Sequence, residues 1–102
     1  MTFIIIYITH KNMAEARKVA THLLKRRLIA CVNYFPITSA YWWNGKIENS
    51  REIVSLVKTK PEHWTKIKSA VKKIHPYTTP CIMKMNVTAN KDYEQWIRKE
   101  TA

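Results

Sequence analysis

The first third of the chain changes from a continuous apolar run to a helical pattern. Residues 2–9 form a β-branched and aromatic run, which is typical of a strand that is buried on both faces. Asn12 can then cap a helix, with Glu15 three residues later as in a capping box. The apolar residues that follow recur at helical spacing: Met13, Ala16, Val19, Ala20, Leu23 and Leu24. The pattern predicts a central strand and then a helix over residues 12–28.

The next apolar segment predicts a long bent strand that ends in a tight turn. Residues 28–43 are mostly apolar, and Pro36 bends or interrupts them before the Asn-Gly pair at 44–45. Asn-Gly between apolar runs is a strong hairpin signal, because a type I′ turn needs positive φ at both central residues. Residues 52–59 then alternate and predict a return strand with two partly apolar faces.

The second half of the chain predicts a further helix, a strand and a short terminal helix. Pro61 suits the first position of a helix, and Pro76 ends that helix because it disfavours helical geometry at His75. The buried stripe of this helix is expected to be Trp64, Ile67, Ala70, Val71 and Ile74. Residues 81–88 alternate with period two and predict a strand, while residues 90–99 predict a short helix.

The order of these elements predicts an α+β fold. It is the split βαβ arrangement, a ferredoxin-like sandwich whose four-stranded antiparallel sheet carries both main helices on one face. A chain of 102 residues fits one domain, so residues 1–102 are assigned to a single ferredoxin-like domain with a long hairpin and a short C-terminal helix. The face of the sheet opposite the helices is predicted to stay open.

Two neighbouring tryptophans at the hairpin indicate an oligomer. Successive strand residues point to opposite faces, so Trp42 and Trp43 cannot share one small core. A large aromatic side chain is strongly favoured to be buried, and an apolar open sheet face implies a partner. We therefore expect one tryptophan to enter the core of the subunit and the other to contact a neighbouring subunit.

The chain is strongly basic, with 18 Lys and Arg against seven Asp and Glu and a net charge of +11. Such a charge favours acidic partners or nonspecific attraction to nucleic acid. The basic residues gather on the two predicted main helices: Arg17, Lys18, Lys25, Arg26, Arg27, Lys66, Lys68, Lys72 and Lys73. They make that side either a solubilising surface or an attachment surface for an anionic partner.

One cluster has the character of metal ligands. The cluster consists of His75, Cys81, Met83 and Met85. Their imidazole, thiolate and thioether groups suit Cu(I), and zinc is the alternative metal. We take His75, Cys81 and Met83 as the candidate metal residues. The competing interpretation is that Cys81 and the methionines are packing residues and that His75 caps the helix before Pro76.

Other chemical signatures are weak, so no enzyme is predicted. His10, His22 and His63 lack the short spacing of zinc motifs and are expected to be surface or packing residues. A single glycine rules out a Gly-rich phosphate loop, and Asp92, the one aspartate, is poorly placed for a triad. Glu48 and Glu52 form a possible acid–base pair, for which a solvated strand edge is the better explanation.

The compartment is expected to be the cytoplasm. The apolar run 3–8 is too short for a signal peptide or a membrane span. Cys31 and Cys81 are then expected to be free thiols, because a reducing compartment keeps cysteines reduced.

Five short motifs stand at residues 30–36, 39–47, 57–59, 75–80 and 92–97, and the most specific combination is Tyr-Trp-Trp-Asn-Gly-Lys-Ile with His-Pro-Tyr about thirty residues later. In order and spacing these motifs resemble the CutA family of divalent-cation tolerance proteins. The resemblance implies a ferredoxin-like subunit in a tight homotrimer, hairpin strands paired across subunits, and a link to copper and other divalent metals. The chain departs from the family pattern at Ile8, Cys81 and Ala89.

Three functions compete at this point. The leading prediction is a trimeric divalent-cation tolerance protein that binds copper or another heavy metal. A trimeric scaffold or small-molecule sensor, resembling PII-type proteins with clefts between subunits, is the alternative. A nucleic-acid-binding module of the RNA-recognition type ranks below both, because one glycine cannot supply the RNP1 pattern.

Overall fold

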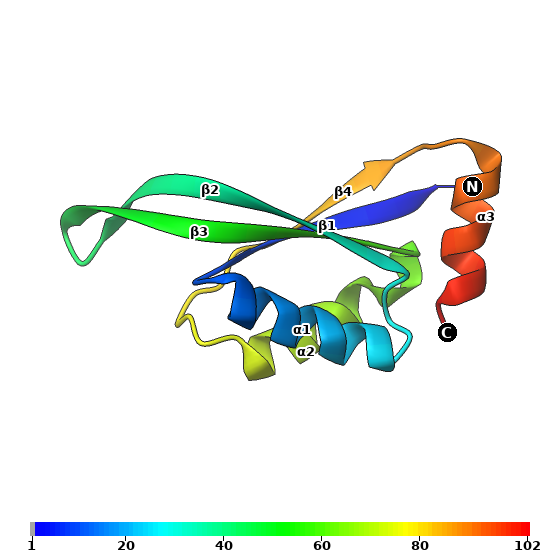
Figure 1. The fold of residues 1–102 in the computed structure, drawn as a ribbon, viewed down its shortest axis with the longest axis horizontal. Coiled ribbons are helices and arrows are strands. Elements are labelled where there is room, and N and C mark those ends of the chain that lie inside the picture. Colours follow the sequence, from blue (N-terminus) through cyan, green and yellow to red (C-terminus); the bar gives the residue numbers. More distant parts are fainter. Residues whose placement is uncertain (1) are drawn as a thin grey trace.

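The computed structural model of the protein describes residues 2–102 and confirms the α+β sandwich. Its four strands pair antiparallel in the order β2-β3-β1-β4. The strands are β1 (Phe3–His10), β2 (Cys31–Trp43), β3 (Lys46–Thr59) and β4 (Ile82–Val87). The helices are α1 (Met13–Lys25), α2 (Trp64–Ile74) and α3 (Lys91–Glu100), with a 3-10 turn η1 (Pro61–His63) before α2. Figure 1 shows α1 and α2 under one face of the sheet and α3 beside its far end.

Helix α1 begins and ends with recognisable caps. The Asn12 side chain accepts a hydrogen bond from the Glu15 backbone N–H at 2.9 Å, as the capping pattern predicts. The helix ends at Lys25, three residues before the predicted end, because Arg27 adopts a left-handed conformation with φ of 56°. The N–H of Leu28 then bonds the carbonyl of Leu23, the pattern of a Schellman motif. This turn buries Leu28 in the core.

The core lies between the sheet and the pair α1 and α2. Ile4, Ile6 and Ile8 of β1 are fully buried and belong to one cluster with helix residues such as Leu23 and Ile67. Because these isoleucines occupy alternate positions, the intervening β1 residues lie on the opposite, open face. The run at residues 2–9 correctly predicts a central strand, but it predicts burial on both faces, whereas Ile5, Tyr7 and Thr9 on the second face are only half-buried in the subunit.

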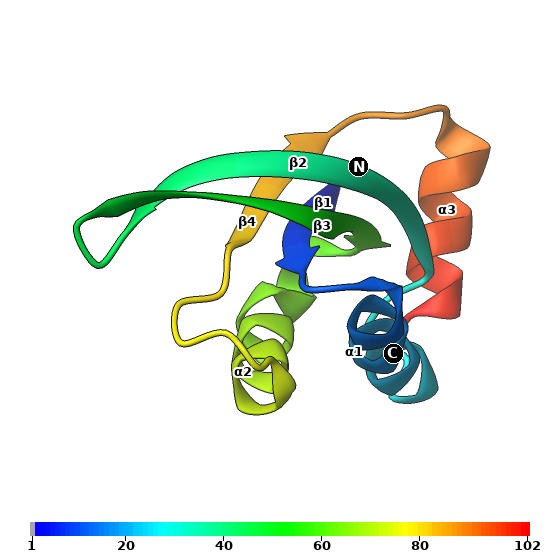
Figure 2. The same ribbon diagram turned by 60° about the vertical axis from the view of Figure 1, so that its left-hand side comes forward.

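The β2–β3 hairpin is longer and more regular than the sequence pattern predicts. Its pairing runs without a break from Cys31 opposite Lys58 to Trp43 opposite Lys46. Pro36 does not interrupt β2, because an edge strand can leave one backbone position without a donor. The return strand begins six residues before the predicted start. Figures 1 and 2 show the hairpin reaching past the body, which explains the elongated dimensions of 45 × 24 × 21 Å.

The Asn-Gly turn is confirmed, whereas the predicted burial of one tryptophan is not. Asn44 and Gly45 both have positive φ, 51° and 76°, as a type I′ turn requires. Trp42 is 73% exposed and Trp43 45% exposed, so neither enters the core of the subunit. The expectation of one buried tryptophan was wrong, because the hairpin carries both beyond the two helices that cover the body (Figure 1).

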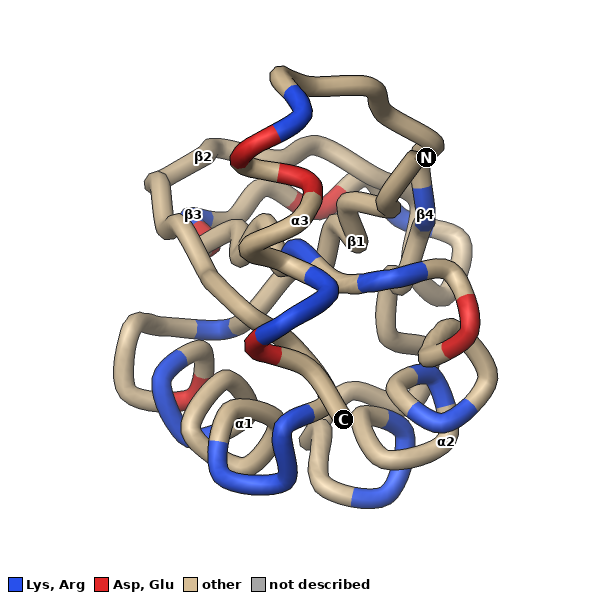
Figure 3. The backbone as a smooth tube through the Cα atoms, turned by 90° about the vertical axis from the view of Figure 1, so that its right-hand side faces the viewer, with Lys and Arg blue, Asp and Glu red and all other residues tan. Residues whose placement is uncertain are grey.

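The basic residues lie where the sequence places them. Figure 3 shows Lys and Arg along α1 and α2, with further cations on α3. Two ion pairs tie acidic groups to this side, Arg27 with Glu100 at 3.1 Å and Arg98 with Glu62 at 3.2 Å. The positive surface therefore lies on the side of the sheet opposite its open face.

Candidate functional site

Cys81 lines a cavity of about 520 Å³ beside the outer part of the β2–β3 hairpin. The lining residues come from β1, β2, β3 and the segment between α2 and β4: Thr9, Ser39, Tyr41, Trp43, Glu52, Pro76, Tyr77, Thr78, Thr79 and Cys81. Register places Ser39, Tyr41 and Trp43 on the same face as Glu52, and Thr9 lies on the β1 face opposite the buried isoleucines. The cavity therefore opens on the sheet face opposite α1 and α2. Figure 2 shows the segment after α2 on the same side of the molecule as the hairpin.

A hydrogen bond between Tyr77 and Glu52 joins the two walls of this cavity. The Tyr77 hydroxyl donates to Glu52 Oε2 at 2.8 Å. Burial and the bond to Glu52 raise the pKa of Tyr77, so the phenol keeps its proton. Burial also raises the pKa of Cys81, with the Glu52 charge acting in the same direction. Cys81 is consequently a protonated thiol at neutral pH unless a cation binds to it.

His75 is held by hydrogen bonds on both ring nitrogens. Its Nε2–H donates to the Thr9 carbonyl at 2.7 Å, and its Nδ1 accepts from the Tyr77 backbone N–H at 3.2 Å. It is the C-cap of α2, as the helix-ending interpretation predicts, and its backbone N–H bonds the carbonyl of Val71. Its ring packs edge-on against Tyr77 with centroids 4.7 Å apart. The imidazole thus fixes Tyr77 and does not line the cavity itself.

Met83 lies farther along the open face. It is 50% exposed and pairs with Tyr7 of β1, while Met85 pairs with Ile5. Both methionines point away from the core, so in the single chain they are not packing residues. The structure therefore separates the three predicted ligands: Cys81 lines the cavity, His75 lies behind Tyr77, and Met83 lies beyond the lining.

The fit of a metal ion to one chain is incomplete. Among residues 2–102, no group of three or more His, Cys, Asp or Glu side chains lies close enough to hold a metal ion. Both cysteines in the chain are free thiols in the structure, as expected. A closed site needs about four ligands. A single subunit can offer Cys81 to a metal, but it does not supply a full set.

Most of the residues that define the cavity were not among the predicted site residues. Glu52 is half-buried and bonded to Tyr77, so it is more than a solvated strand edge. Tyr41, Trp43 and Glu52 share a strand face, which the period-two pattern could have revealed once the hairpin was known to reach Lys46. The contribution of Tyr77 depends on the path of the segment after α2, and no periodic pattern describes that path.

His10 is a buried packing residue, which agrees with one of the two expectations for it. Its Nε2 lies 2.7 Å from Ser55 Oγ, and its ring stacks on His75 with centroids 5.3 Å apart. Its Nδ1 is buried without a hydrogen-bond partner among the described residues. Burial, and secondarily the proximity of His75, lowers the pKa of His10 to about 4. The imidazole is therefore neutral at physiological pH.

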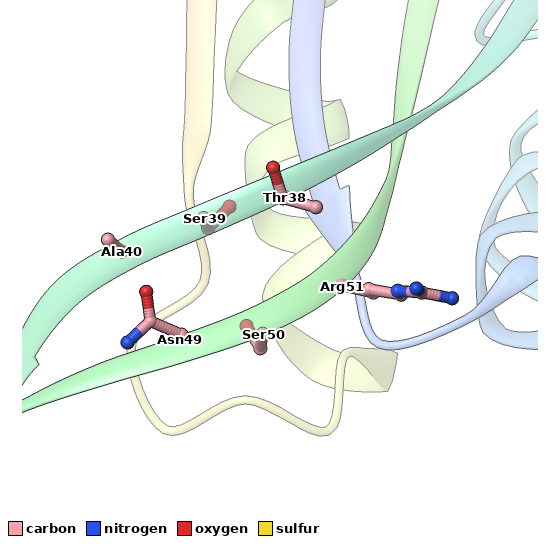
Figure 4. A pocket seen from close by; sticks show the side chains of 6 residues that line it. All are labelled: Thr38, Ser39, Ala40, Asn49, Ser50 and Arg51. Carbon is pink, nitrogen blue, oxygen red and sulfur yellow. The ribbon is translucent and has the colours of Figure 1, made fainter.

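A smaller hollow of about 330 Å³ lies along the hairpin itself. Figure 4 shows its lining: short side chains from Thr38 to Ala40 on β2, and Asn49, Ser50 and Arg51 on β3. Arg51 extends away from the other five side chains (Figure 4). The hollow contains neither a cluster of titratable groups nor an aromatic ring, so the Cys81 cavity is the better candidate site.

Comparison with known proteins agrees with this architecture. The model of a protein family described as CutA1 divalent ion tolerance protein matches residues 4–100. The chain belongs to the CutA1 family. It is 44% identical over 93 residues to the divalent-cation tolerance protein CutA of Archaeoglobus fulgidus, which covers 90% of this chain and 91% of that protein. It is 41% identical over 99 residues to the CutA protein of Pyrococcus horikoshii, covering 96% and 97%.

Solved structures of CutA1 proteins share the fold closely. The Archaeoglobus fulgidus structure has a TM-score of 0.94 at 41% identity and covers 96% of this chain and 97% of that one. CutA1 from Oryza sativa has a TM-score of 0.95 at 29% identity, with coverage of 100% and 95%. The family description names tolerance to divalent ions and names no reaction. None of the helices within residues 2–102 is long and apolar enough to cross a membrane.

Proposed function

We propose that the protein acts in divalent-cation tolerance as a homotrimer that binds copper, with zinc as the second candidate ion. Membership in the CutA1 family supports the role in cation tolerance. The relatives from Archaeoglobus fulgidus and Pyrococcus horikoshii carry the name divalent-cation tolerance protein. We place the protein in the cytoplasm, although the solved Archaeoglobus fulgidus relative is described as periplasmic.

The exposed apolar face of the sheet is the observation that supports an oligomeric assembly. The register puts several large side chains on the face opposite α1 and α2, each at least 38% exposed: Phe35, Tyr41, Trp43, Met83 and Met85. Exposed apolar patches of this extent mark interaction surfaces, and the edge strands β2 and β4 leave backbone groups unpaired. A second subunit on this face would cover both. Three subunits are what the resemblance to the family implies.

The metal-binding part of the proposal centres on Cys81, with His75 and Met83 as the other candidate ligands. Thiolate, thioether and imidazole ligands together favour Cu(I). His75 can bind a metal only after one of its ring nitrogens gives up a hydrogen bond, either to Thr9 or from Tyr77. Because one chain lacks a closed set of ligands, the remaining ones would come from a neighbouring subunit or from solvent.

Native mass spectrometry with and without copper tests the oligomeric state and the binding of copper in one experiment. We expect the mass of three subunits and a stoichiometric copper adduct that is lost in Cys81→Ser. Cys31→Ser is the matched control, since Cys31 is also a half-buried free thiol on the open face. His75→Ala and Met83→Leu then rank the other two ligands. A monomer at micromolar concentration refutes the trimer, and copper binding that survives in Cys81→Ser refutes the ligand assignment.

A second candidate function, a sensor of small molecules, is favoured by the size of the Cys81 cavity. Its volume of about 520 Å³ exceeds what one metal ion occupies and lies within the range of small-ligand sites. The nucleic-acid alternative is less favoured. In the RNA-recognition arrangement, sheet aromatics and basic groups act on one strand together, whereas here the basic helices lie opposite the open face (Figure 3).

A further inference from the structure

We propose that the outer surface of α1 and α2 binds the phosphate backbone of a nucleic-acid duplex without reading its sequence. The surface consists of exposed lysine and arginine side chains on the two helices and on the C-cap of α1: Arg17, Lys18, Lys25, Arg26, Lys66, Lys72 and Lys73. We call this set the basic helix surface. The inference goes beyond the metal-binding proposal and does not depend on it, because it requires neither the Cys81 cavity nor a metal ion.

The basic helix surface lies on the outside of the helical layer. The apolar stripes of both helices are buried against the sheet: Ala16, Val19, Ala20 and Leu23 on α1, and Ile67, Ala70 and Val71 on α2. Lys18 and Lys25 are about two helical turns apart, and so are Lys66 and Lys73. Each pair therefore shares one face of its helix, with about 10 Å between its members along the axis.

This surface faces away from the proposed subunit interface. A neighbour that packs on the open face lies on the other side of the sheet from α1 and α2, along which Figure 3 shows the cations. A second copy of the basic helix surface is unsuitable as a cover, because like charges repel when they meet. Helix α2 contains no acidic residue and α1 contains only Glu15. The surface is therefore accessible in the single chain and in the proposed trimer.

The cations of the basic helix surface make no ion pair with any residue of the range 2–102. Arg27 pairs with Glu100 at 3.1 Å, and Lys68 Nζ lies 5.1 Å from the centroid of the Trp64 ring, so neither is counted in the surface. Cations that gather without carboxylates produce a positive potential that attracts anions. A duplex carries a dense row of phosphates and releases its condensed counterions when such cations bind, which favours the complex.

The lack of exposed apolar groups separates a nucleic acid from the other anionic partners. Leu24, 41% exposed, is the one large apolar side chain of α1 and α2 that is exposed. Helices that bind a membrane surface combine cations with an apolar face that enters the bilayer, and protein interfaces have an apolar core. Interfaces with nucleic acids are more polar and much more positively charged. The composition of the surface thus favours a nucleic acid.

The surface is suited to phosphates and not to unstacked bases. It has no exposed Trp, Tyr or Phe, because the Trp64 ring is half-buried with Lys68 and Lys84 Nζ atoms 5.1 and 5.3 Å from its centroid. Proteins that bind single strands use exposed aromatic rings on which bases stack. A rigid pair of helices matches the regular phosphate rows of a duplex instead. This mode differs from the RNA-recognition arrangement, since no aromatic side chain of the sheet takes part.

Fluorescence anisotropy with a labelled DNA duplex of about 20 base pairs tests the proposal. In about 0.15 M salt with a metal chelator, we expect a Kd of about 1–100 μM and the same affinity, within about threefold, for a duplex of unrelated sequence. Log K should fall with log salt with a slope of about −4, from about five phosphate contacts. No binding at about 100 μM protein, or a sequence preference above about tenfold, overturns the proposal.

Charge reversals locate the contact. Lys18→Glu and Lys73→Glu, one on each helix, should each weaken duplex binding at least about tenfold and make the salt slope shallower. Lys91→Glu is the matched control, because Lys91 is exposed at the start of α3, away from α1 and α2 (Figure 1), and the net charge changes equally. Its affinity should stay within about threefold of the wild type. Equal losses in the control, or no loss in Lys18→Glu and Lys73→Glu, contradict the assignment.

Competitors separate the duplex from other anions. Unlabelled duplex should displace the probe at least about tenfold better than polyglutamate of equal charge, and better than vesicles of phosphatidylserine and phosphatidylcholine at equal anionic charge. Equal or better competition by polyglutamate or by vesicles overturns the proposal in favour of an acidic protein or a membrane. Circular dichroism and native mass of each variant show whether fold and assembly are intact.

Copper binding separates this inference from the metal proposal. Lys18→Glu should bind copper like the wild type, because Lys18 and Cys81 lie on opposite sides of the sheet. Cys81→Ser should keep the duplex affinity of the wild type. A loss of duplex binding in Cys81→Ser with the fold and assembly intact would place the contact outside the basic helix surface and refute the assignment.

Discussion

The body of the sheet and the tip of the hairpin use the same pattern of strand pairing but differ in what covers them. In the body, Ile4, Ile6 and Ile8 have no exposed surface, because α1 and α2 pack against their face. At the tip, backbone pairing continues to Trp43 and Lys46, yet Trp42 is largely exposed. A two-stranded hairpin is only marginally stable by itself in water. In the proposed trimer, contacts with a neighbouring subunit would supply the stability that the tip lacks in a single chain.

Removing a core side chain from the body is expected to give the largest effect. Ile6→Ala should lower the free energy of unfolding by about 2–5 kcal/mol, since it removes buried surface and leaves a cavity under α1 and α2. Urea denaturation at one fixed protein concentration measures it. Ile5→Ala, on the open face of the same strand, is the control and should cost clearly less. Equal losses for the two variants would mean that the open face is packed as tightly as the core.

Acid should destabilise the body through His10, a buried titratable group. Its pKa falls from the ordinary value of 6.5 to about 4 in the folded protein. Above pH 6.5 the ring is neutral in both states, so its full contribution is present. Between pH 6.5 and 4 the unfolded chain binds a proton that the folded chain does not, so stability falls with pH by up to about 3 kcal/mol. Below pH 4 the ring is protonated in both states, and this loss levels off.

The pH dependence of unfolding in wild type and His10→Gln isolates this contribution. The carboxylates titrate in both proteins, so the difference between the two curves reports the imidazole. We expect the wild-type protein to lose more stability than the variant between pH 6.5 and 4. Parallel curves would show that His10 titrates normally in the folded protein.

Two serines of β3 allow the stability cost of losing a hydroxyl group to be compared between the body of the sheet and the tip of the hairpin. Ser55 is buried with its Oγ 2.7 Å from His10 Nε2, and Ser50 donates to the exposed Tyr41 hydroxyl at 3.4 Å. Ser55→Ala leaves the buried imidazole with a polar atom unpaired and should cost about 1–3 kcal/mol. Ser50→Ala should stay within about 0.5 kcal/mol. Thermal unfolding of both variants gives the comparison, which fails if Ser50→Ala is the more costly change.

A substitution at the turn should affect the tip and leave the body folded. Gly45 has φ of 76°, so Gly45→Val places a β-branched residue in the left-handed region at about 1–2 kcal/mol. No atom lies within 4 Å of the added Cβ, so the expected cost comes from the backbone and not from a clash. Light scattering should report weaker assembly, while the helical circular dichroism signal stays unchanged. Gly45→Asn, which tolerates positive φ, should assemble like the wild type.

Local patterns were sufficient for most of the fold. The cap at Asn12, the Asn-Gly turn and the helix end at His75 each depend on a few neighbouring residues, and all three are confirmed. The errors arose where distant contacts decide the outcome. Pro36 was expected to bend or interrupt β2; β2 is one long curved strand (Figure 2), and the interruption does not occur because Pro36 pairs with Ile53 at the edge of the sheet. The position of a strand in its sheet cannot be seen in the strand's own sequence.

The candidate site was harder to predict than the fold. His75 and Cys81 were grouped by sequence as candidate ligands of one metal site. The structure instead directs the His75 ring to the Thr9 carbonyl and brings Tyr77 to Glu52, 25 positions away in the chain. Spacing predicts which residues share a face of one element. It does not predict which faces of separate elements meet, because that depends on packing.

The sequence by itself determined the main elements of this protein and its surplus of positive charge, because periodicity, caps and composition are local or additive properties. Family membership also followed from short phrases of sequence, and the family match over residues 4–100 confirms it. Only the tertiary structure decided that both tryptophans are exposed, that His75 is bonded at both ring nitrogens and that Glu52 accepts a hydrogen bond from Tyr77. Each of these facts depends on how far the hairpin reaches beyond the two helices and on the path of the segment after α2. Both are properties of the packed chain as a whole.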